Sequence, residues 1–151
     1  MFGLFKSKKI SIYSPTSGNI IDLSQVQDEV FSAGMAGNGV AIEPSNGIFC
    51  SPIDGIIKIF PTKHAFTVKS GELEVIVHIG IDTVELKGDG FVALVDTGAK
   101  VKAGEPIIEA DLDFILGSGK STITPIVVNK NKIENIKLGL VDKITQIMEV
   151  S

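Results

Sequence analysis

The chain has 151 residues, enough for one domain with a substantial core, and despite a mean hydropathy of +0.32 it holds no apolar run near the roughly 18 to 20 residues that a transmembrane helix needs. A net charge of −4 with scattered lysines argues against the basic face of a nucleic-acid-binding protein. A single cysteine excludes an internal disulfide framework and is typical of a reducing compartment, so we expect a cytosolic protein.

The N-terminal residues 1–10 are expected to form a flexible leader before one domain over residues 11–151. A loose, solvated terminus is the simplest interpretation of this leader. Its apolar and basic side chains could instead contact the anionic inner face of a membrane transiently. These side chains are Phe2, Leu4, Phe5, Lys6, Lys8 and Lys9.

Short runs rich in β-branched residues, punctuated by glycine, predict strands along the body of the chain. They cover residues 18–21, 39–42, 47–50, 55–60, 65–69, 73–79, 106–109 and 126–128, and residues 98–107 form a further turn-and-strand unit. Many short strands with 16 glycines predict an all-β fold, an antiparallel β-sandwich or barrel-like domain with only short helical turns. The candidates for those turns are residues 112–116 and 133–138.

The run Gly117-Ser118-Gly119-Lys120-Ser121-Thr122 is similar to part of a phosphate-binding loop. The position that should carry the first glycine of that motif is Phe114. A helix should follow so that its backbone amides cradle phosphates, whereas residues 123–128 are typical of a strand with a proline. We therefore reject nucleotide binding at this run.

His64 and His78 are the only histidines of the chain. Residues 72–79 alternate in period two, which places His78 and the apolar Ile76 on the more polar face of a strand. Such a pair is typical of a docking site for another protein, and an ordinary surface histidine is the alternative. Imidazole is neutral near pH 7 without much tuning, so two rings in contact would suit phosphoryl carriage, acid–base work or metal binding.

Phosphoryl carriage makes modest demands, because the protein mainly positions a nucleophile in line and stabilises charge on the phosphoryl oxygens. One imidazole nitrogen attacks while the other is held as a hydrogen-bond donor. A second histidine and a nearby hydroxyl can hydrogen-bond the bound phosphoryl group, and no metal is needed. Thr62, two residues before His64, is a plausible hydroxyl for this contact. Catalytic zinc generally takes three protein ligands, and lysostaphin-like zinc peptidases use three histidines, two of them in a His-x-His pattern. This chain has only two histidines and no His-x-His, which argues against zinc hydrolysis.

Residues 58–66 and 77–91, which include the run His78-Ile79-Gly80-Ile81-Asp82-Thr83-Val84, closely resemble the glucose-type enzyme IIA of the bacterial sugar phosphotransferase system. The resemblance extends over most of the chain and includes residues 37–42, 52–55, 98–104 and 120–125. It implies a β-sandwich phosphocarrier over residues 11–151 with the phosphoryl group on Nε2 of His78. It also implies His64 as the companion that contacts this group, Thr62 as a hydrogen-bonding hydroxyl, and Gly80 as the carbonyl that fixes the tautomer of His78.

The same resemblance implies the partners. The donor would be the phosphorylated histidine-containing phosphocarrier protein, and the acceptor a cysteine on the IIB domain of a glucose-type permease. The implied docking surface has an apolar centre and two acidic positions that face basic residues of the carrier, an arrangement that excludes water and steers encounter. The apolar residues are Val30, Phe31, Met35, Phe60, Ile76 and Val84, and the acidic ones are Asp28 and Asp82.

A regulatory module is the alternative that the resemblance leaves open. In some relatives of this kind the unphosphorylated form binds permeases or kinases and so reports sugar supply. There His64 and His78 could share a zinc ion with a carboxylate of the partner, although the carrier reaction itself requires no cofactor.

Overall fold

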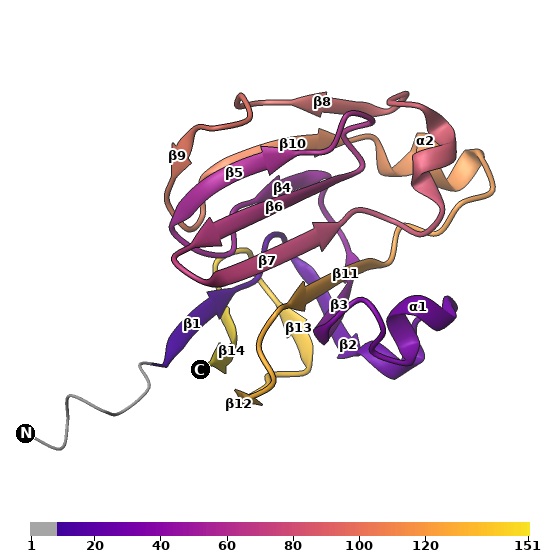
Figure 1. Cartoon of the computed structure of the whole chain (residues 1–151). Helices are drawn as coiled ribbons and strands as arrows, with labels where there is room; N and C mark the ends of the chain where they lie inside the picture. The colour runs from indigo at the N-terminus through magenta and orange to yellow at the C-terminus, as the bar shows by residue number, and fades with distance from the viewer. Residues whose placement is uncertain (1–8) are drawn as a thin grey trace, which may run out of the picture.

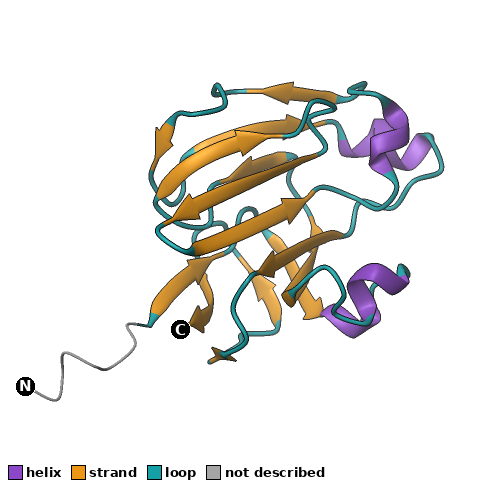
Figure 2. Cartoon of the chain, viewed as in Figure 1, coloured by secondary structure: helices purple, strands orange, loops and turns teal. Residues whose placement is uncertain are grey.

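The computed structural model describes residues 9–151, and within that range the fold is built from three antiparallel sheets with little helix (Figures 1 and 2). The largest sheet has the strand order β13 (Gly139–Val141), β2 (Gly18–Asp22), β3 (Asn38–Pro44), β11 (Thr124–Val128), β7 (Leu73–His78), β6 (Ala65–Ser70), β5 (Gly55–Ile59) and β9 (Lys100–Val101). The second has β4 (Ile48–Cys50), β10 (Pro106–Ala110) and β8 (Phe91–Ala93). The third has β1 (Ile10–Tyr13), β14 (Gln146–Val150) and β12 (Ile133–Glu134).

The helical segments of the described residues are each a turn or two long. They are α1 (Glu29–Ser32), α2 (Leu112–Gly117) and the 3₁₀ turns η2 (Leu23–Gln25) and η3 (Thr83–Leu86). The prediction of an all-β antiparallel fold with short helical turns is confirmed. Among residues 9–151 no helix has the length and apolar character to cross a membrane.

Of the two predicted helical turns, one is confirmed and one is wrong. Residues 112–116 form α2, where the Asp111 carboxylate accepts a hydrogen bond from the backbone N–H of Phe114 and so caps the first turn. Residues 133–138 form no helix: Ile133 and Glu134 are the strand β12 instead, because Ile133 pairs with Val150 in the third sheet and packs against the core. Asn135 then adopts a left-handed conformation, with a φ of 54°, that ends this strand.

The third sheet also bears on the predicted leader. Strand β1 begins at Ile10, within the residues expected to be flexible, and the Lys9 ammonium lies 3.4 Å from the Glu134 carboxylate. The proposed membrane contact rests on Phe2, Leu4, Phe5, Lys6 and Lys8, which lie outside the described residues.

One hydrophobic core joins all three sheets. The largest side chains in it are fully buried and come from every layer, among them Phe49 of β4, Phe66 of β6, Ile108 of β10 and Met148 of β14. Burying each such side chain stabilises the fold by about 1.5 to 3 kcal/mol. The alternation predicted for β7 is present, because Leu73, Val75 and Val77 are buried while the residues between them are half-buried.

A second, smaller core lies on the outer face of the large sheet. Leu23, Val26 and Phe31, from the segment that contains η2 and α1, pack over Ala41 of β3 and Val127 of β11. Strand β11 is therefore buried along its whole length, since it has a core on each face. This cover brings α1 to the edge of β7, close to His78.

The β6–β7 hairpin determines where the histidines lie. Ser70 pairs with Leu73 across a two-residue turn in which Gly71 has a φ of 59°. In this register Ala65 pairs with His78, so His64 and His78 occupy the two chain ends at the open end of the hairpin. In Figure 1 this end of β7 points toward the side of the molecule where α1 and α2 stand.

Candidate functional site: a pair of histidines at the open end of a hairpin

His64 is presented by a tight turn that enters β6. The backbone N–H of Phe60 donates to the Ala65 carbonyl at 3.0 Å, and that of Lys63 donates to the Phe60 carbonyl at 2.8 Å. Lys63 has a φ of 59°, a left-handed conformation that turns the chain back on itself. The turn places the Thr62 hydroxyl 2.5 Å from Nδ1 of His64. Thr62 thus contacts the companion histidine, in a contact that fixes the orientation of the ring.

His78 is held by the turn that leaves β7. Its Nδ1 lies 2.8 Å from the carbonyl oxygen of Gly80. A carbonyl oxygen can only accept a hydrogen bond, so this contact keeps the proton on Nδ1 and leaves a lone pair on Nε2. Gly80 has a φ of 78°, and a Cβ atom there would come within 2.5 Å of the Thr83 methyl carbon and 2.6 Å of the Ser121 carbonyl oxygen. Only glycine fits this position without displacement.

The two imidazoles form the centre of a chain of four rings. The centroids of His64 and His78 are 4.9 Å apart with an angle of 78° between the rings. Phe31 of α1 packs on His78 with a centroid distance of 5.1 Å, and Phe60 packs edge-on against His64 at 5.7 Å. The His64–His78 and Phe60–His64 contacts are edge-to-face, a geometry that aromatic rings prefer, and the Phe31–His78 contact is tilted. The site is therefore an imidazole pair flanked on each side by an apolar ring.

Burial makes both imidazoles weak bases. It lowers the pKa of His64 to about 4, and the neighbouring His78 adds to that effect. Burial also lowers the pKa of His78, while the Gly80 carbonyl and the carboxylates of Asp28 and Asp82 partly oppose this shift. Both rings are neutral at pH 7, as a nitrogen nucleophile must be.

The two acidic residues near His78 differ in what their side chains do. The Asp28 carboxylate accepts a hydrogen bond from the Val30 backbone N–H at 2.9 Å and caps α1. Asp82 precedes η3 with a φ of 59°, and its side chain makes no capping hydrogen bond. The Asp82 carboxylate is exposed, and both carboxylates favour positive charge on His78.

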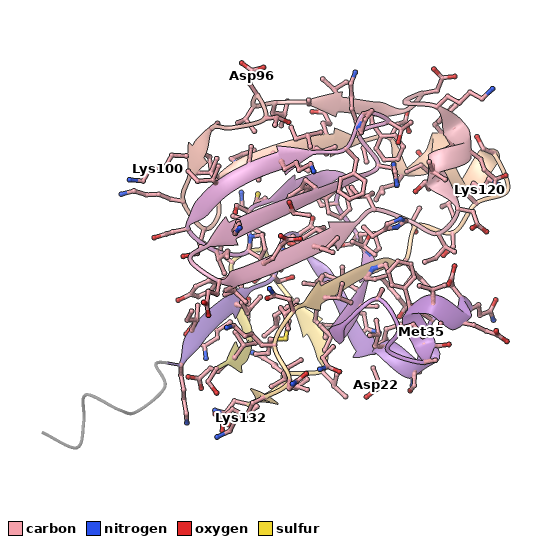
Figure 3. All side chains as sticks on the ribbon, viewed as in Figure 1. Asp22, Met35, Asp96, Lys100, Lys120 and Lys132 are labelled. Atoms are coloured by element: carbon pink, nitrogen blue, oxygen red, sulfur yellow. The ribbon has the colours of Figure 1, made fainter. Side chains whose placement is uncertain are left out.

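The residues predicted to dock a partner fall into two groups. Val30, Met35 and Val84 are exposed, with Met35 exposing 74% of its surface beside α1 (Figure 3). Phe31 is buried against His78, and Phe60 and Ile76 are half-buried. Ile76 packs against the small core that contains Phe31, so it contributes to the packing behind the site. We call Val30, Met35 and Val84 the exposed apolar patch.

The sequence alone did not single out two residues that shape the His78 turn. Thr83 is fully buried, and its hydroxyl donates to the Ile79 carbonyl at 2.6 Å. Ser121 accepts a hydrogen bond on its carbonyl from the Ile81 N–H at 3.1 Å, in an isolated bridge between distant segments. Both residues lie in runs that the resemblance includes, but nothing local in the sequence indicates that the Ser121 carbonyl meets the Ile81 N–H.

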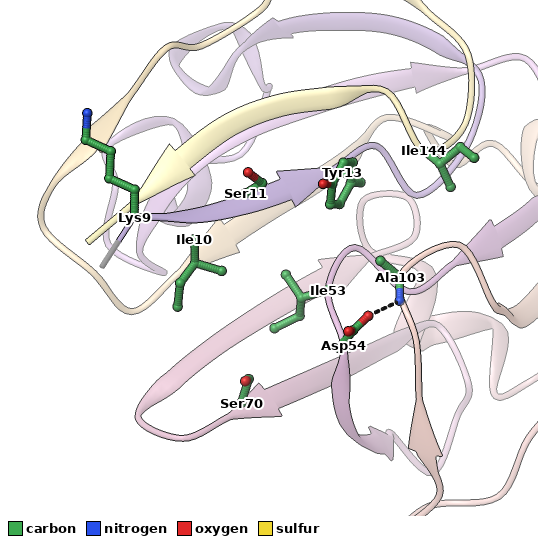
Figure 4. Close-up of a pocket in the computed structure, with 9 residues that line it drawn as sticks. All are labelled: Lys9, Ile10, Ser11, Tyr13, Ile53, Asp54, Ser70, Ala103 and Ile144. Carbon is green, nitrogen blue, oxygen red and sulfur yellow. Dashed lines mark hydrogen bonds between the residues drawn. The ribbon is translucent and has the colours of Figure 1, made fainter. Parts of the chain in front are cut away.

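Within residues 9–151 no group of three or more histidine, cysteine or carboxylate side chains lies close enough together to hold a metal ion. A pocket of about 630 Å³ lies elsewhere, between β1, the Ile53–Asp54 turn and Ile144 (Figure 4). It adjoins Ser70, at the opposite end of β6 from His64, and neither histidine lines it. Val30 adjoins Phe31 in α1, and Val84 lies in η3, which follows the His78 turn. The histidine pair thus lies near exposed apolar side chains, which suits a protein as substrate.

An antiparallel β-domain that presents two neutral histidines beside such a patch has the features of a protein-to-protein group carrier. The comparisons with known proteins identify its family. Residues 10–133 match the model of the family described as phosphoenolpyruvate-dependent sugar phosphotransferase system, EIIA 1. This chain belongs to that family.

Individual relatives agree with this assignment. The glucose-specific EIIA component of Bacillus cereus is 43% identical over 141 residues, which cover 91% of this chain and 86% of that protein. The structure is similar to that of glucose permease IIA from Mycoplasma capricolum, with a TM-score of 0.90 and 34% identity over 95% of this chain and 96% of that one.

A third relative is a much longer protein. The glucose-specific EIICBA component of Staphylococcus saprophyticus is 41% identical over 139 residues, which are 91% of this chain but only 20% of that protein.

The family match and the glucose-specific relatives together show that the protein described here is a phosphocarrier of the phosphotransferase system, a transferase component that relays phosphoryl groups in sugar transport. This role implies a phosphocarrier protein as donor and a IIB component as acceptor.

Proposed function

We propose that Nε2 of His78 is the atom that carries the phosphoryl group. The observation that supports this most directly is the 2.8 Å contact between His78 Nδ1 and the Gly80 carbonyl, because it directs the lone pair to Nε2. His64, whose Nδ1 faces the Thr62 hydroxyl, is the companion rather than the nucleophile. A hydroxyl can donate or accept, so it does not commit His64 to one tautomer.

The transfer balances without an external acid or base. The Nε2 lone pair attacks phosphorus, the P–N bond to the donor's histidine breaks, and the electron pair of that bond returns to the donor ring. The proton on Nδ1 stays in its hydrogen bond with the Gly80 carbonyl, so the phosphorylated ring carries positive charge. Asp28 and Asp82 stabilise this charge, and a positively charged ring is a good leaving group for the onward step.

His64 stabilises the phosphoryl oxygens. When the Thr62 hydroxyl donates to Nδ1, the proton of His64 lies on Nε2 and can be donated to a phosphoryl group on the adjacent His78 ring. The low pKa of His64 keeps this donor neutral, and Phe60 holds the ring by edge-on packing. Preformed donors of this kind stabilise developing charge because they need no reorganisation.

The exposed apolar patch is proposed to receive both partners, with Asp28 and Asp82 steering basic residues of the donor. The donor would be the histidine-containing phosphocarrier protein, and the acceptor the IIB domain of a glucose-type permease, in line with the glucose-specific relatives. We further propose a cytoplasmic domain that begins with β1 at Ile10 and follows a short N-terminal leader, with transient contact to the membrane through Phe2, Leu4, Phe5, Lys6 and Lys8.

A regulatory role on the same surface is a second proposal, supported by the exposure of Val30, Met35 and Val84. Its signature is binding of a permease or kinase that phosphorylation of His78 weakens. Zinc shared through His64 and His78 would need further ligands from the partner, because a closed zinc site takes four and the described residues supply no third. Equilibrium dialysis of zinc with and without the partner would decide this point.

The experiment that tests the carrier proposal is intact-mass spectrometry after incubation with phosphoenolpyruvate, enzyme I and the phosphocarrier protein. We expect the wild type to gain one phosphate that acid removes, as a phosphoramidate should be removed. His78→Ala should gain none. His64→Ala is the control: it keeps the proposed acceptor atom on His78 and should still gain a phosphate. Labelling of His78→Ala to the level of the wild type would place the acceptor elsewhere.

A further inference from the structure

The turn that follows His78 is held at several backbone groups in succession. The Ile79 N–H donates to the carbonyl of His64 at 2.7 Å, and the Ile79 carbonyl accepts from the Thr83 hydroxyl at 2.6 Å. One peptide further, the Ile81 N–H donates to the Ser121 carbonyl at 3.1 Å. These contacts enclose Gly80, whose own carbonyl accepts from His78.

Gly80 needs such support because glycine has no intrinsic preference for its observed φ of 78° over the mirror-image region. A peptide group is planar, so fixing the carbonyl of Ile79 on one side and the N–H of Ile81 on the other fixes the direction of the Gly80 carbonyl between them. Thr83 supplies the first restraint from a position with no exposed surface. Its methyl group also packs where a Cβ of Gly80 would lie.

We infer that Thr83 is a positioning residue for phosphoryl transfer, whose buried hydroxyl holds the Gly80 carbonyl against Nδ1 of His78 and so keeps the lone pair on Nε2. This inference rests on the proposed function, in which Nε2 of His78 is the acceptor. Thr83 touches neither the ring nor the phosphoryl group, and acts through the Ile79–Gly80 peptide alone. Loss of its hydroxyl leaves the Ile79 carbonyl unpaired in the core and lets the glycine turn relax.

The test compares Thr83→Val, which removes the hydroxyl at constant shape, with the wild type. A long-range proton–nitrogen spectrum of histidine-labelled protein at pH 8 reports which ring nitrogen carries the proton. We expect one tautomer at His78 in the wild type, with the proton on Nδ1, and a mixture of both tautomers in Thr83→Val. The rate of phosphoryl acceptance should fall about tenfold or more, as expected for a misplaced reacting group.

A second pair of variants guards against misfolding of Thr83→Val. Thr83→Ser and Thr83→Ala both lose the methyl group and differ only in the hydroxyl, so the serine variant should keep the wild-type tautomer and the alanine variant should not. Thr16→Val is the matched control. Thr16 lies in the turn between β1 and β2, is also buried, and its hydroxyl also donates to a backbone carbonyl, that of Asn46. It should leave the His78 tautomer and the acceptance rate unchanged.

A single Nδ1–H tautomer and a wild-type acceptance rate in Thr83→Ala and Thr83→Val would overturn the inference while leaving His78 as the acceptor. A changed acceptance rate with an unchanged His78 tautomer in these variants would also overturn the inference. If instead His78→Ala still accepts phosphate, the proposed function fails, and the tautomer measurement still decides whether Thr83 holds the His78 ring.

Discussion

The two turns at the open end of the β6–β7 hairpin each supply a hydrogen-bond partner to a histidine ring, but the partners differ in kind. Before β6, the ring of His64 is met by a side-chain hydroxyl, that of Thr62, in a turn whose Pro61 and Lys63 are exposed. After β7, the ring of His78 is met by a backbone carbonyl, that of Gly80, in a turn that is buried. A hydroxyl can reverse its role and a carbonyl cannot.

This difference separates the roles of two otherwise similar rings. A nucleophile benefits from a tautomer that never changes, and the Gly80 carbonyl provides that for His78. A residue that must hold a phosphoryl group in one step and release it in the next benefits from an adjustable partner, and the Thr62 hydroxyl provides that for His64. In the proposed function, the backbone partner of His78 and the side-chain partner of His64 are what distinguish the carrier atom from its helper.

The strongest challenge to this comparison is His64→Gln. Glutamine keeps an amide donor, so the variant should still accept the phosphoryl group on His78, but Phe60 and Thr62 cannot hold the amide as they hold the ring. Onward transfer to the IIB partner should slow roughly a hundredfold to a thousandfold, as when a preformed donor is lost. Rapid-quench measurement of both half-reactions checks this, and onward transfer at the wild-type rate would remove His64 from the mechanism.

The buried turn is expected to tolerate change poorly. Gly80→Ala would set a Cβ against Thr83 and the Ser121 carbonyl at a positive φ, and should cost about 3 kcal/mol or more of the free energy of unfolding. Gly71→Ala is the matched control at the other end of the hairpin, where φ is 59° and the space is open, and it should cost only about 1 kcal/mol. Urea unfolding measures both, and equal costs would contradict the crowding at Gly80.

The depressed pKa of His64 predicts a particular dependence of stability on pH. The unfolded chain binds a proton at His64 near pH 6.5, whereas the folded protein binds it only near pH 4, so stability is full above 6.5 and falls as the pH drops toward 4. The lowered pKa of His78 acts in the same direction. The His64 part should amount to about 1 to 3 kcal/mol.

His64→Gln should remove this part while leaving the carboxylate contributions in place. The free energy of unfolding, measured in urea at pH 7.5 and at pH 4.5, should therefore fall less in the variant than in the wild type. An identical fall in both proteins would show that His64 ionises alike in the folded and unfolded states.

The smallest expected effect concerns the exposed turn. Thr62→Val removes the hydroxyl beside His64 Nδ1, which should slow onward transfer about tenfold, the value of one hydrogen bond. Stability should change little, because Thr62 is only half-buried. Thr62→Ser should restore the rate. A normal rate for Thr62→Val would mean that the ring is held by Phe60 packing alone.

Local pattern was a good guide where a contact spans few residues. The alternation over residues 72–79 predicted which side chains of β7 are buried, and Thr62 and Gly80 each contact a histidine two residues away. It misled at residues 133–138, where Ile136 and Leu138 are exposed and Ile133 is committed to a strand. The pattern of residues 133–138 does not contain the partner strand, so it could not show that Ile133 pairs with Val150.

The sequence by itself limited the chemistry open to this protein: two imidazoles, a hydroxyl and a glycine lie in runs that resemble a phosphohistidine carrier, on a chain patterned for short antiparallel strands. The tertiary structure decided that the two rings meet, since only the register that pairs Ala65 with His78 brings them together. It also brought Phe31 onto His78 and Ser121 against the Gly80 turn. Such contacts join residues that are far apart in the sequence and meet only when the two cores pack. No short run of residues therefore contains the information that specifies them.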